Sequence, residues 1–235
     1  MGLKWLLFLA LLWTIGCTGT ETGNPSLQQS LTLRARSRDP ADVTLGSGQG
    51  RIRIDAAWVV LGEVALGECG GPHEPVLDPV ATDLAAAPET RSFAHERPSY
   101  CALDTGWERS AAHAPAHAPP ELPGRSLVVL GRRSDDVPFR LGSTLNLPIQ
   151  VATPAPGFDL GEPLILAFDV AQWFSAVDLD TATVDPNDST IRIGVSENAA
   201  LLALLEASLP ASATLHHDAN ENGLLDPEEQ SVIAQ

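Results

Sequence analysis

The residues best arranged for chemistry lie near the end of the chain, in the segment 218–229. Its sequence, DANENGLLDPEE, matches at every fixed position a calcium-loop pattern in which oxygen-bearing side chains alternate around a central glycine. Calcium prefers about six to eight oxygen ligands wrapped in a tight turn. The predicted calcium ligands are Asp218, Asn220, Asn222, the backbone carbonyl of Leu224, Asp226 and Glu229.

The flanks of this segment depart from a complete EF-hand, which places a helix on each side of the loop. Pro210 interrupts the approach to the loop, and six residues follow Glu229. The segment is therefore closer to the single calcium loops of extracellular proteins, such as those in dockerin repeats. Because Asn220 and Asn222 are uncharged, we expect a dissociation constant of ~10⁻⁴–10⁻³ M and a structural role. The alternative is a solvated acidic turn around Asn222 that holds no cation.

Other residues that could do chemistry are less favourably spaced. His113 and His117 stand four apart, as zinc ligands on one helix would, but prolines between and after them break a helix and favour a loop. Trp58, Trp107 and Trp173 could stack on a sugar ring, although burial in the core is the more common use of tryptophan in such folds.

Acidic residues also cluster after the apolar run at 164–170. They could hold a second cation or form a solvated loop, and they are Asp178, Asp180, Asp185 and Asp188. The pair His216-His217 beside the calcium loop could contact a transition metal or lie exposed at a strand end. No nucleophile elbow occurs, so the sequence predicts a protein without enzymatic activity.

The three cysteines fall into two groups. Cys17 stands where the N-terminal apolar run ends, and the small residue Gly16 precedes it, as at a signal-peptide cleavage site. In an oxidising compartment, Cys69 and Cys101 would form a disulfide that contributes about 3–4 kcal/mol in the chain-entropy model. Two buried thiols are the alternative. A catalytic or metal-binding pair is disfavoured because neither cysteine has a CxxC partner.

The N-terminus predicts export. Lys4 precedes an uncharged apolar run over 5–15, which suits a secretory signal but is shorter than the ~20 residues of a membrane-spanning helix. The cysteine context resembles the lipobox of bacterial lipoproteins, except that Thr14 stands where leucine is usual. Acyl chains on Cys17 would anchor the protein stably. The next residue is Thr18, which by analogy with other bacterial lipoproteins favours sorting to the outer membrane. Ordinary cleavage that leaves a free cysteine is the alternative.

The charge balance narrows the class of partner. The chain has 30 acidic residues against 14 lysines and arginines, which gives a net charge of −16. Lys4 is its only lysine, so removal of residues 1–16 would leave a net charge of −17. An acidic surface repels phosphate backbones, which argues against nucleic acid as a partner, and it suits divalent cations.

Short apolar runs separated by turns predict the strands that would carry these residues. Leu31, Leu33 and Ala35 alternate with polar residues, as in a half-buried strand. Further strands are predicted at 51–66, 99–104, 126–131, 139–141, 145–152, 164–170 and 190–195, with 82–87 a short strand or a helical turn.

One helix is predicted late in the chain, over 197–208. Ser196 would be its N-cap, and Pro210 would end it. Its apolar side would consist of Leu201, Leu204, Leu205 and Leu209.

These elements predict a mainly β fold, namely an antiparallel β-sandwich with one late α-helix and a C-terminal EF-hand-like loop. A small α+β domain is the alternative. The expected organisation is a signal peptide over 1–16, a lipidated tether over 17–29, a β-sandwich domain over 30–209 and a calcium-loop tail over 210–235.

Several short segments resemble one group of proteins. The string TETGNP over 20–25 is similar to the start of uncharacterised lipoproteins of myxobacteria and related deltaproteobacteria. The segments AWVVLGE over 57–63, SYC over 99–101 and FDVAQW over 168–173 also resemble that group, as does an ending with a calcium-like loop. The resemblance implies a lipoprotein with an exported β domain. It implies no activity and assigns no functional residue.

These observations favour an exported, calcium-stabilised binding or structural module at the cell envelope, which would meet a protein or glycan ligand. A carbohydrate-binding or adhesion module is the alternative, and it requires an exposed strip of aromatic side chains. A hydrolase would require a cleft where histidine, aspartate and serine converge, and the sequence predicts none.

Overall fold

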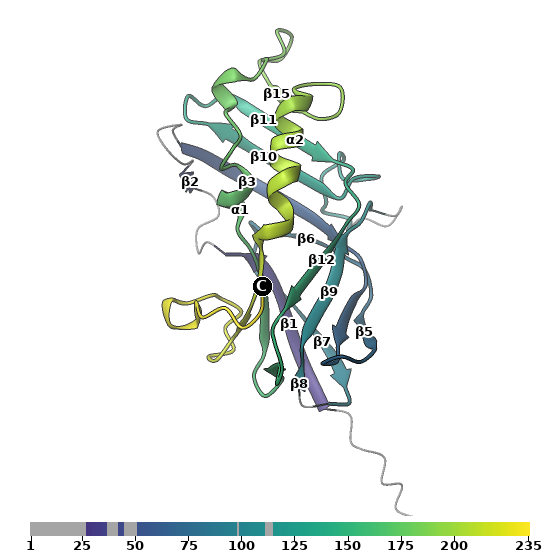
Figure 1. Ribbon diagram of the computed structural model, residues 1–235. Helices are drawn as coiled ribbons and strands as arrows, with labels where there is room; N and C mark the ends of the chain where they lie inside the picture. Colours follow the sequence, from purple (N-terminus) through teal and green to yellow (C-terminus); the bar gives the residue numbers. More distant parts are fainter. Residues whose placement is uncertain (1–26, 37–41, 45–50, 98, 111–114) are drawn as a thin grey trace, which may run out of the picture.

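The computed structural model describes residues 27–36, 42–44, 51–97, 99–110 and 115–235 (Figure 1). The early strands are β1 (Leu27–Ala35), β2 (Asp42–Thr44), β3 (Arg51–Leu61), β4 (Val64–Gly67), β5 (His73–Leu77), β6 (Val80–Asp83), β7 (Glu89–His95), β8 (Ser99–Tyr100) and β9 (Ala102–Trp107). The later strands are β10 (Leu127–Arg133), β11 (Pro138–Ser143), β12 (Leu147–Ala152), β13 (Phe158–Asp159), β14 (Leu164–Phe168), β15 (Ile191–Ile193) and β16 (Ala213–His217). The helical segments are α1 (Val170–Trp173), η2 (Leu179–Thr181), α2 (Ala199–Ser208), η3 (Leu209–Ser212) and η4 (Pro227–Glu229).

The larger sheet is built around the long strand β3. Its ten strands include the path β15-β11-β10-β3-β9-β4-β5, and β2, β6 and β12 pair beside that path. Most ladders are antiparallel, as expected of a sandwich, and β11 pairs with β15 in parallel. From Ala57 to Leu61, β3 is buried on both faces, which explains why its apolar residues run without alternation there.

The smaller sheet has four strands in the order β16-β14-β1-β7. β1 lies parallel to β14 and antiparallel to β7. Leu31, Leu33 and Ala35 face the core, as their alternation predicts. Thr32 and Arg34 are buried as well, so the prediction that β1 is half-buried was wrong. The C-terminal segment covers their face of the sheet, and local alternation gives no information about such a distant cover.

The core lies between the two sheets and beneath the helices. In Figure 1 the smaller sheet faces the lower half of the larger sheet, and α1 and α2 lie over its upper half. Trp107, Phe168 and Trp173 meet where the two halves join, with ring centroids 5.5–6.5 Å apart. One continuous apolar cluster therefore connects the sandwich with the helical layer. The predicted mainly β, sandwich-type fold with one late helix is confirmed.

The late helix starts two residues after its predicted beginning. α2 begins at Ala199, and Asn198 rather than Ser196 is its N-cap. Asn198 has a φ of 51° and makes no capping hydrogen bond, because its side chain binds the backbone of Thr183 and the carbonyl of Arg192. The hydrogen bonds of Asn198 to Thr183 and Arg192 therefore explain why the helix begins later than the sequence predicts.

The buried side of α2 also differs in one position. Leu201, Leu205 and Leu209 are buried as predicted, but Leu204 is 44% exposed, and Leu202 is buried instead. Pro210 ends the α-helix, and the chain continues through the 3-10 segment η3.

The strands that the sequence did not predict are short or polar. β7 reads ETRSFAH and has exposed charged residues, yet it pairs with β1 over seven positions. β16 contains His216-His217 and pairs with β14 as an edge strand of the smaller sheet. Partner strands rather than their own apolar pattern hold these segments in place.

The predicted disulfide between Cys69 and Cys101 is confirmed, with Cα atoms 4.9 Å apart. Cys69 follows β4, and Cys101 joins β8 to β9. β4 and β9 are paired, so the bond closes the end of an existing ladder. In the part of the chain that the structure describes, no helix is long and apolar enough to cross a membrane.

Candidate metal centre

The predicted calcium loop, 218–229, folds back over the outer face of the smaller sheet. It leaves β16 at Asp218, whose backbone N–H donates to the Pro163 carbonyl at 2.8 Å. Leu225 is buried against Ile165 and Ala167 of β14 and fixes the middle of the loop to the sheet. In Figure 1 the loop is the yellow segment beside β1 and the C-terminus.

The loop accounts for the buried polar residues of β1. Arg34 Nη1 donates to the Gly223 carbonyl at 2.8 Å, which joins β1 to the centre of the loop. Gly223 has a φ of 67°, as a tight turn at the central loop position requires. A Cβ atom at this position would contact Pro88 and Thr32 at about 3.4–3.5 Å, so the loop backbone lies directly on the sheet.

Three carboxylates of the loop are turned inward. Asp218, Asp226 and Glu229 are 2%, 7% and 6% exposed. The two oxygens of Asp218 accept the backbone N–H groups of Asn222 at 3.1 Å and Gly223 at 2.8 Å. This bonding turns the loop around its first predicted ligand.

The last predicted ligand closes the loop from the other end. Glu229 accepts the N–H of Asn220 at 3.1 Å and the N–H of Asp226 at 3.1 Å, one on each carboxylate oxygen. Asp226 and Glu229 also form a reciprocal capping box at η4. The first and last turns of the loop are thereby held together.

The asparagine amides complete this network. The side chains of Asn220 and Asn222 donate to the same oxygen of Asp226, at 3.0 and 2.8 Å. The carbonyl of Leu224 accepts from the backbone N–H of Asp226 at 3.1 Å. All six predicted ligand residues therefore belong to one compact group that is rich in oxygen atoms.

Carboxylates alone do not form a metal centre here. Across the described ranges, no three histidine, cysteine, aspartate or glutamate side chains are grouped closely enough to hold an ion. Calcium would also need the amide oxygens and the Leu224 carbonyl, which are the ligand types that it accepts. Calcium binding stays a prediction.

His216 connects the end of the loop to β16 and is fully buried. Its Nδ1 lies 3.2 Å from the carbonyls of both Glu229 and Ser231, and Nε2 lies 2.9 Å from the Thr214 hydroxyl. Two carbonyl acceptors place the proton on Nδ1. Burial lowers the pKa of His216, so the ring is neutral at pH 7 and both nitrogens are occupied within the protein. This bonding argues against His216 as a transition-metal ligand.

The three tryptophans that could stack on a sugar lie in the interior. Trp107 and Trp173 are fully buried, and Trp58 is 4% exposed with its ring 5.2 Å from that of His117. His117 thus packs on a tryptophan, and His113, its proposed zinc partner, lies outside the described residues.

The acidic residues after β14 have separate roles. Asp178 caps η2, and Asp180 lies 3.4 Å from Arg133. Asp185 and Asp188 both pair with Arg192, and these contacts raise the pKa of Arg192 and lower that of Asp188. Pairing with arginine thus accounts for three of the four, and helix capping for Asp178.

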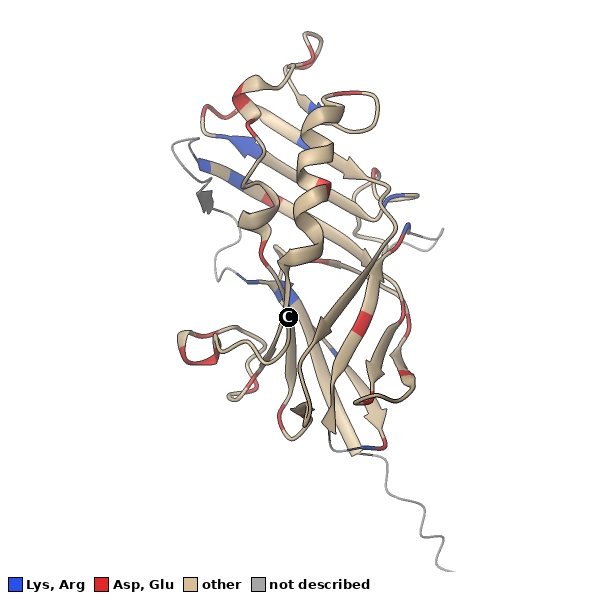
Figure 2. Ribbon diagram, in the orientation of Figure 1, with Lys and Arg blue, Asp and Glu red and all other residues tan. Residues whose placement is uncertain are grey.

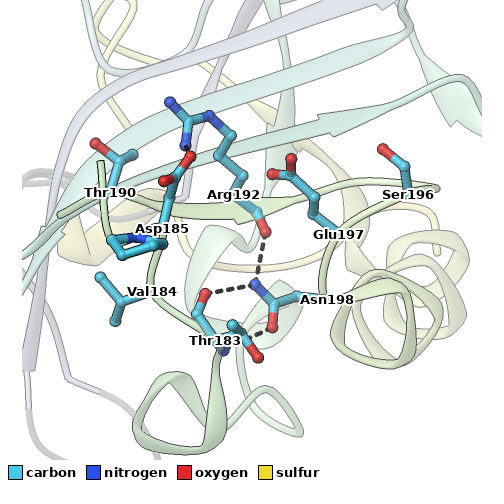
Figure 3. A pocket seen from close by; sticks show the side chains of 9 residues that line it. Thr183, Val184, Asp185, Thr190, Arg192, Ser196, Glu197 and Asn198 are labelled. Carbon is cyan, nitrogen blue, oxygen red and sulfur yellow. Dashed lines mark hydrogen bonds and ion pairs between the residues drawn. The ribbon is translucent and has the colours of Figure 1, made fainter. Parts of the chain in front are cut away.

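Figure 3 shows the hollow beside these pairs, with a volume of about 340 Å³. Arg192, Glu197 and Asn198 line it together with residues 183–186. The sequence pointed to Asp185 as a possible cation ligand, but it did not predict a hollow here. Arg192, on the short strand predicted at 190–195, is a second signal, but the pairing of that strand with β11 is a long-range property that the sequence did not predict.

Cys17 and residues 1–16, the predicted lipid site and signal peptide, lie outside the described residues. No protein-family model matches the chain, and no curated protein matches it. Among solved structures, the chain is similar to MbnP from Methylosinus trichosporium, with 13% identity and a TM-score of 0.46 over 83% of this chain and 99% of that one.

Proposed function

We propose that this protein is an exported, lipid-anchored module of the cell envelope whose C-terminal loop binds calcium in a structural role. The observation that carries the proposal is the fold of residues 218–229 over the smaller sheet, with three carboxylates buried in one loop. Buried carboxylates are costly unless strong donors or cations compensate them. Calcium supplies that compensation in loops of this sequence pattern.

The position of the loop supports a structural rather than a sensory role. Leu225 and the Arg34–Gly223 hydrogen bond fix the loop to β14 and β1, so the cation would hold a cover in place. A sensory calcium site opens a pair of helices. Here a β-strand precedes the loop and a single 3-10 turn, η4, lies within it.

The lipid anchor in this proposal rests on the N-terminal sequence. β1 begins at Leu27, at the lower end of the sandwich in Figure 1. Nine residues, 18–26, separate Cys17 from β1, and the fully extended chain from Cys17 to Leu27 spans at most ~35 Å. An anchor on Cys17 would therefore keep the lower end of the sandwich near the membrane, and the end that carries α2 and β15 would face away.

The proposal includes no catalytic step. A hydrolase needs a nucleophile beside a general base. Among the described residues, no serine hydroxyl is hydrogen-bonded to a histidine, and Cys69 and Cys101 are joined to each other.

A carbohydrate module is the second candidate, and the tryptophan positions weaken it. Sugar-binding surfaces present aromatic faces to solvent. Trp58, Trp107 and Trp173 are all buried. The described part of the chain therefore presents no strip of exposed tryptophans.

Calcium binding to the full chain, purified in detergent, is the decisive experiment. Calorimetry should find at least one site with a dissociation constant of ~10⁻⁴–10⁻³ M, and excess EDTA should lower the melting temperature. The double variant Asp218→Ala, Glu229→Ala should lose that site. The matched control Glu221→Ala, Glu228→Ala removes the same charge from exposed positions of the same loop and should bind calcium like the wild type.

A wild type that gives no heat of binding and melts equally in calcium and EDTA would reduce the loop to an acidic turn. If the carboxylate variant does not fold, Asn220→Ala tests the same site, because Asn220 is exposed and supplies one predicted ligand oxygen. Its calcium affinity should fall while its fold stays intact.

A further inference from the structure

Arginines gather on the end of the larger sheet that is farthest from Leu27. In Figure 2, blue segments mark arginines on the strands in the upper half of the larger sheet. β11 and β15 are parallel neighbours, and their register places Arg140 opposite Arg192. Residues opposite each other in a ladder point to the same face, so two guanidinium groups stand side by side there.

Two glycines leave the same face open beyond the arginines. Gly142 and Gly194 follow Arg140 and Arg192 by two residues, and so lie on the same face. A Cβ atom on Gly194 would have only the Gly142 carbonyl within reach, at 3.9 Å. The floor of this part of the sheet is thus bare backbone.

Arg125 occupies part of the space above this floor. A methyl group at position 142 would collide with the Arg125 guanidinium, so that group lies directly on the Gly142 backbone. Arg125, Arg140 and Arg192 together line a hollow of about 250 Å³ with Glu121, Glu197 and Ser196. We name this the Arg125 hollow.

The three arginines differ in their pairing. Arg140 pairs with Glu121 at 2.5 Å, and Arg192 pairs with Asp185 and Asp188. Arg125 has no side-chain hydrogen bond or ion pair with any residue that the structure describes, although it is half-buried. Guanidinium groups removed from bulk water are usually matched by a carboxylate or phosphate, which their planar fork fits with two hydrogen bonds.

We propose that the Arg125 hollow binds a small ligand through one oxyanion group, a carboxylate or a phosphate, which pairs with Arg125 above the Gly142 floor. The carboxylate pairs of Arg140 and Arg192 hold those side chains in place and leave Arg125 as the group that lacks an anion. No property of the calcium loop enters this inference.

The surroundings restrict the rest of the ligand. The hollow of Figure 3 shares Arg192, Ser196 and Glu197 with the Arg125 hollow, so the two hollows are neighbours. Glu197 is exposed and its carboxylate forms no ion pair within the described chain. A second anionic group would be repelled there, whereas a hydroxyl or ammonium group would be accepted. The ligand class is therefore a single oxyanion with a hydrogen-bond donor on its body.

Titration of the full chain in detergent, in a buffer free of calcium, tests this inference, with inorganic phosphate and glycolate as probes and ethylene glycol as a neutral control. We expect saturable binding of at least one anion below 20 mM by calorimetry, and none of ethylene glycol. The variant Arg125→Gln should weaken binding at least about tenfold, as loss of a charge-assisted hydrogen bond does. Arg91→Gln, on the exposed part of β7, is the matched control and should bind like the wild type.

A second variant separates the site from general charge effects. Gly142→Ala keeps all charges, displaces the end of one flexible side chain, and should also weaken binding without changing the melting temperature. Phosphate or glycolate binding alone would identify the oxyanion, and binding of both would define a general oxyanion site. The inference is overturned if neither anion binds at 20 mM or if Arg125→Gln binds as tightly as the wild type.

Discussion

At the scale of single residues, burial decides what the polar side chains do. His216 is neutral at pH 7 because burial lowers its pKa, an effect that its hydrogen bonds to the carbonyls of Glu229 and Ser231 offset only in part. Thr32 and Arg34, which the strand pattern places on a solvent face, are buried by the C-terminal loop. Side chains of the same type also differ in their pairing: Arg140 is exposed and pairs with Glu121, whereas Arg125 is half-buried and has no carboxylate partner among the described residues.

Tyr100 provides a prediction at this scale. It is fully buried, and its hydroxyl donates to Glu74 at 2.9 Å. Burial, followed by that hydrogen bond, raises the pKa of Tyr100 to about 12. The unfolded chain releases the same proton near pH 10, so the contribution of Tyr100 to the free energy of unfolding is complete below pH 10 and is lost between pH 10 and pH 12.

Urea unfolding at pH 9 and pH 11.5 measures this effect. Because Glu74 is partly in solvent, which screens the pair, we expect the wild type to lose about 1–2 kcal/mol of its free energy of unfolding through this residue. Tyr100→Phe has no proton to release and should show a correspondingly smaller loss over the same range. Equal losses in both proteins would contradict the prediction.

At the scale of elements, the loop 218–229 acts as a cover for the smaller sheet. Strands β1, β14 and β16 of that sheet place Thr32, Arg34, Ile165 and His216 on one outer face, and the loop and its flank close over them. Leu225 is the apolar contact that fixes the loop to this face. The packing of Leu225 and the proposed calcium ion would therefore both stabilise the backbone of residues 218–229.

Leu225→Ala tests that coupling. Removal of a buried leucine side chain typically costs about 2–5 kcal/mol, and the small size of this cluster favours the lower end, about 2 kcal/mol. Because the loop would then be less firmly held, its calcium affinity should fall as well. Denaturant unfolding and calorimetry measure the two effects.

Leu204→Ala is the control for this variant, because Leu204 is exposed on α2 and should change the free energy of unfolding by less than about 0.5 kcal/mol. A Leu225→Ala protein that is as stable as this control would show that the loop does not depend on its contact with β14.

At the scale of the whole molecule, the two ends of the fold have different environments in our proposal. Leu27 marks the end from which the tether leaves, and the Arg125 hollow lies on the part of the larger sheet beyond α1. An anchor on Cys17 would leave that hollow open to the surrounding solution. In this proposal, anchoring through Cys17 would therefore place the Arg125 hollow where it can meet a ligand from solution.

Cys17→Ser tests the anchor. Without the thiol, no acyl chain can be added, and the chain should move almost entirely from the membrane fraction to the soluble fraction of cells. Incorporation of a labelled fatty acid should be lost at the same time. Thr18→Ala leaves the cysteine in place and should stay with the membrane and keep its label. A Cys17→Ser protein that still sediments with membranes would refute a lipid anchor.

The sequence by itself determined the local features of this protein. Alternating and continuous apolar residues predicted most of the long strands and the late helix, because the spacing of apolar residues follows the repeat of a strand or a helix. The disulfide was predictable because only two cysteines lie outside the N-terminal run, and such a pair is expected to join in the oxidising compartment that our proposal assigns to the chain. The spacing of Asp218 to Glu229 gave the loop, because its turn and side-chain oxygens are adjacent in sequence.

Only the tertiary structure decided the rest. β7 and β16 are strands because β1 and β14 pair with them, and their own residues carry too little apolar pattern to show it. Asn198 replaced Ser196 at the start of α2 because a loop 15 residues earlier binds its side chain. The Arg125 hollow unites residues from 121 to 197 through strand register. Such contacts depend on which distant segments fold side by side, and no local pattern in the chain encodes that choice.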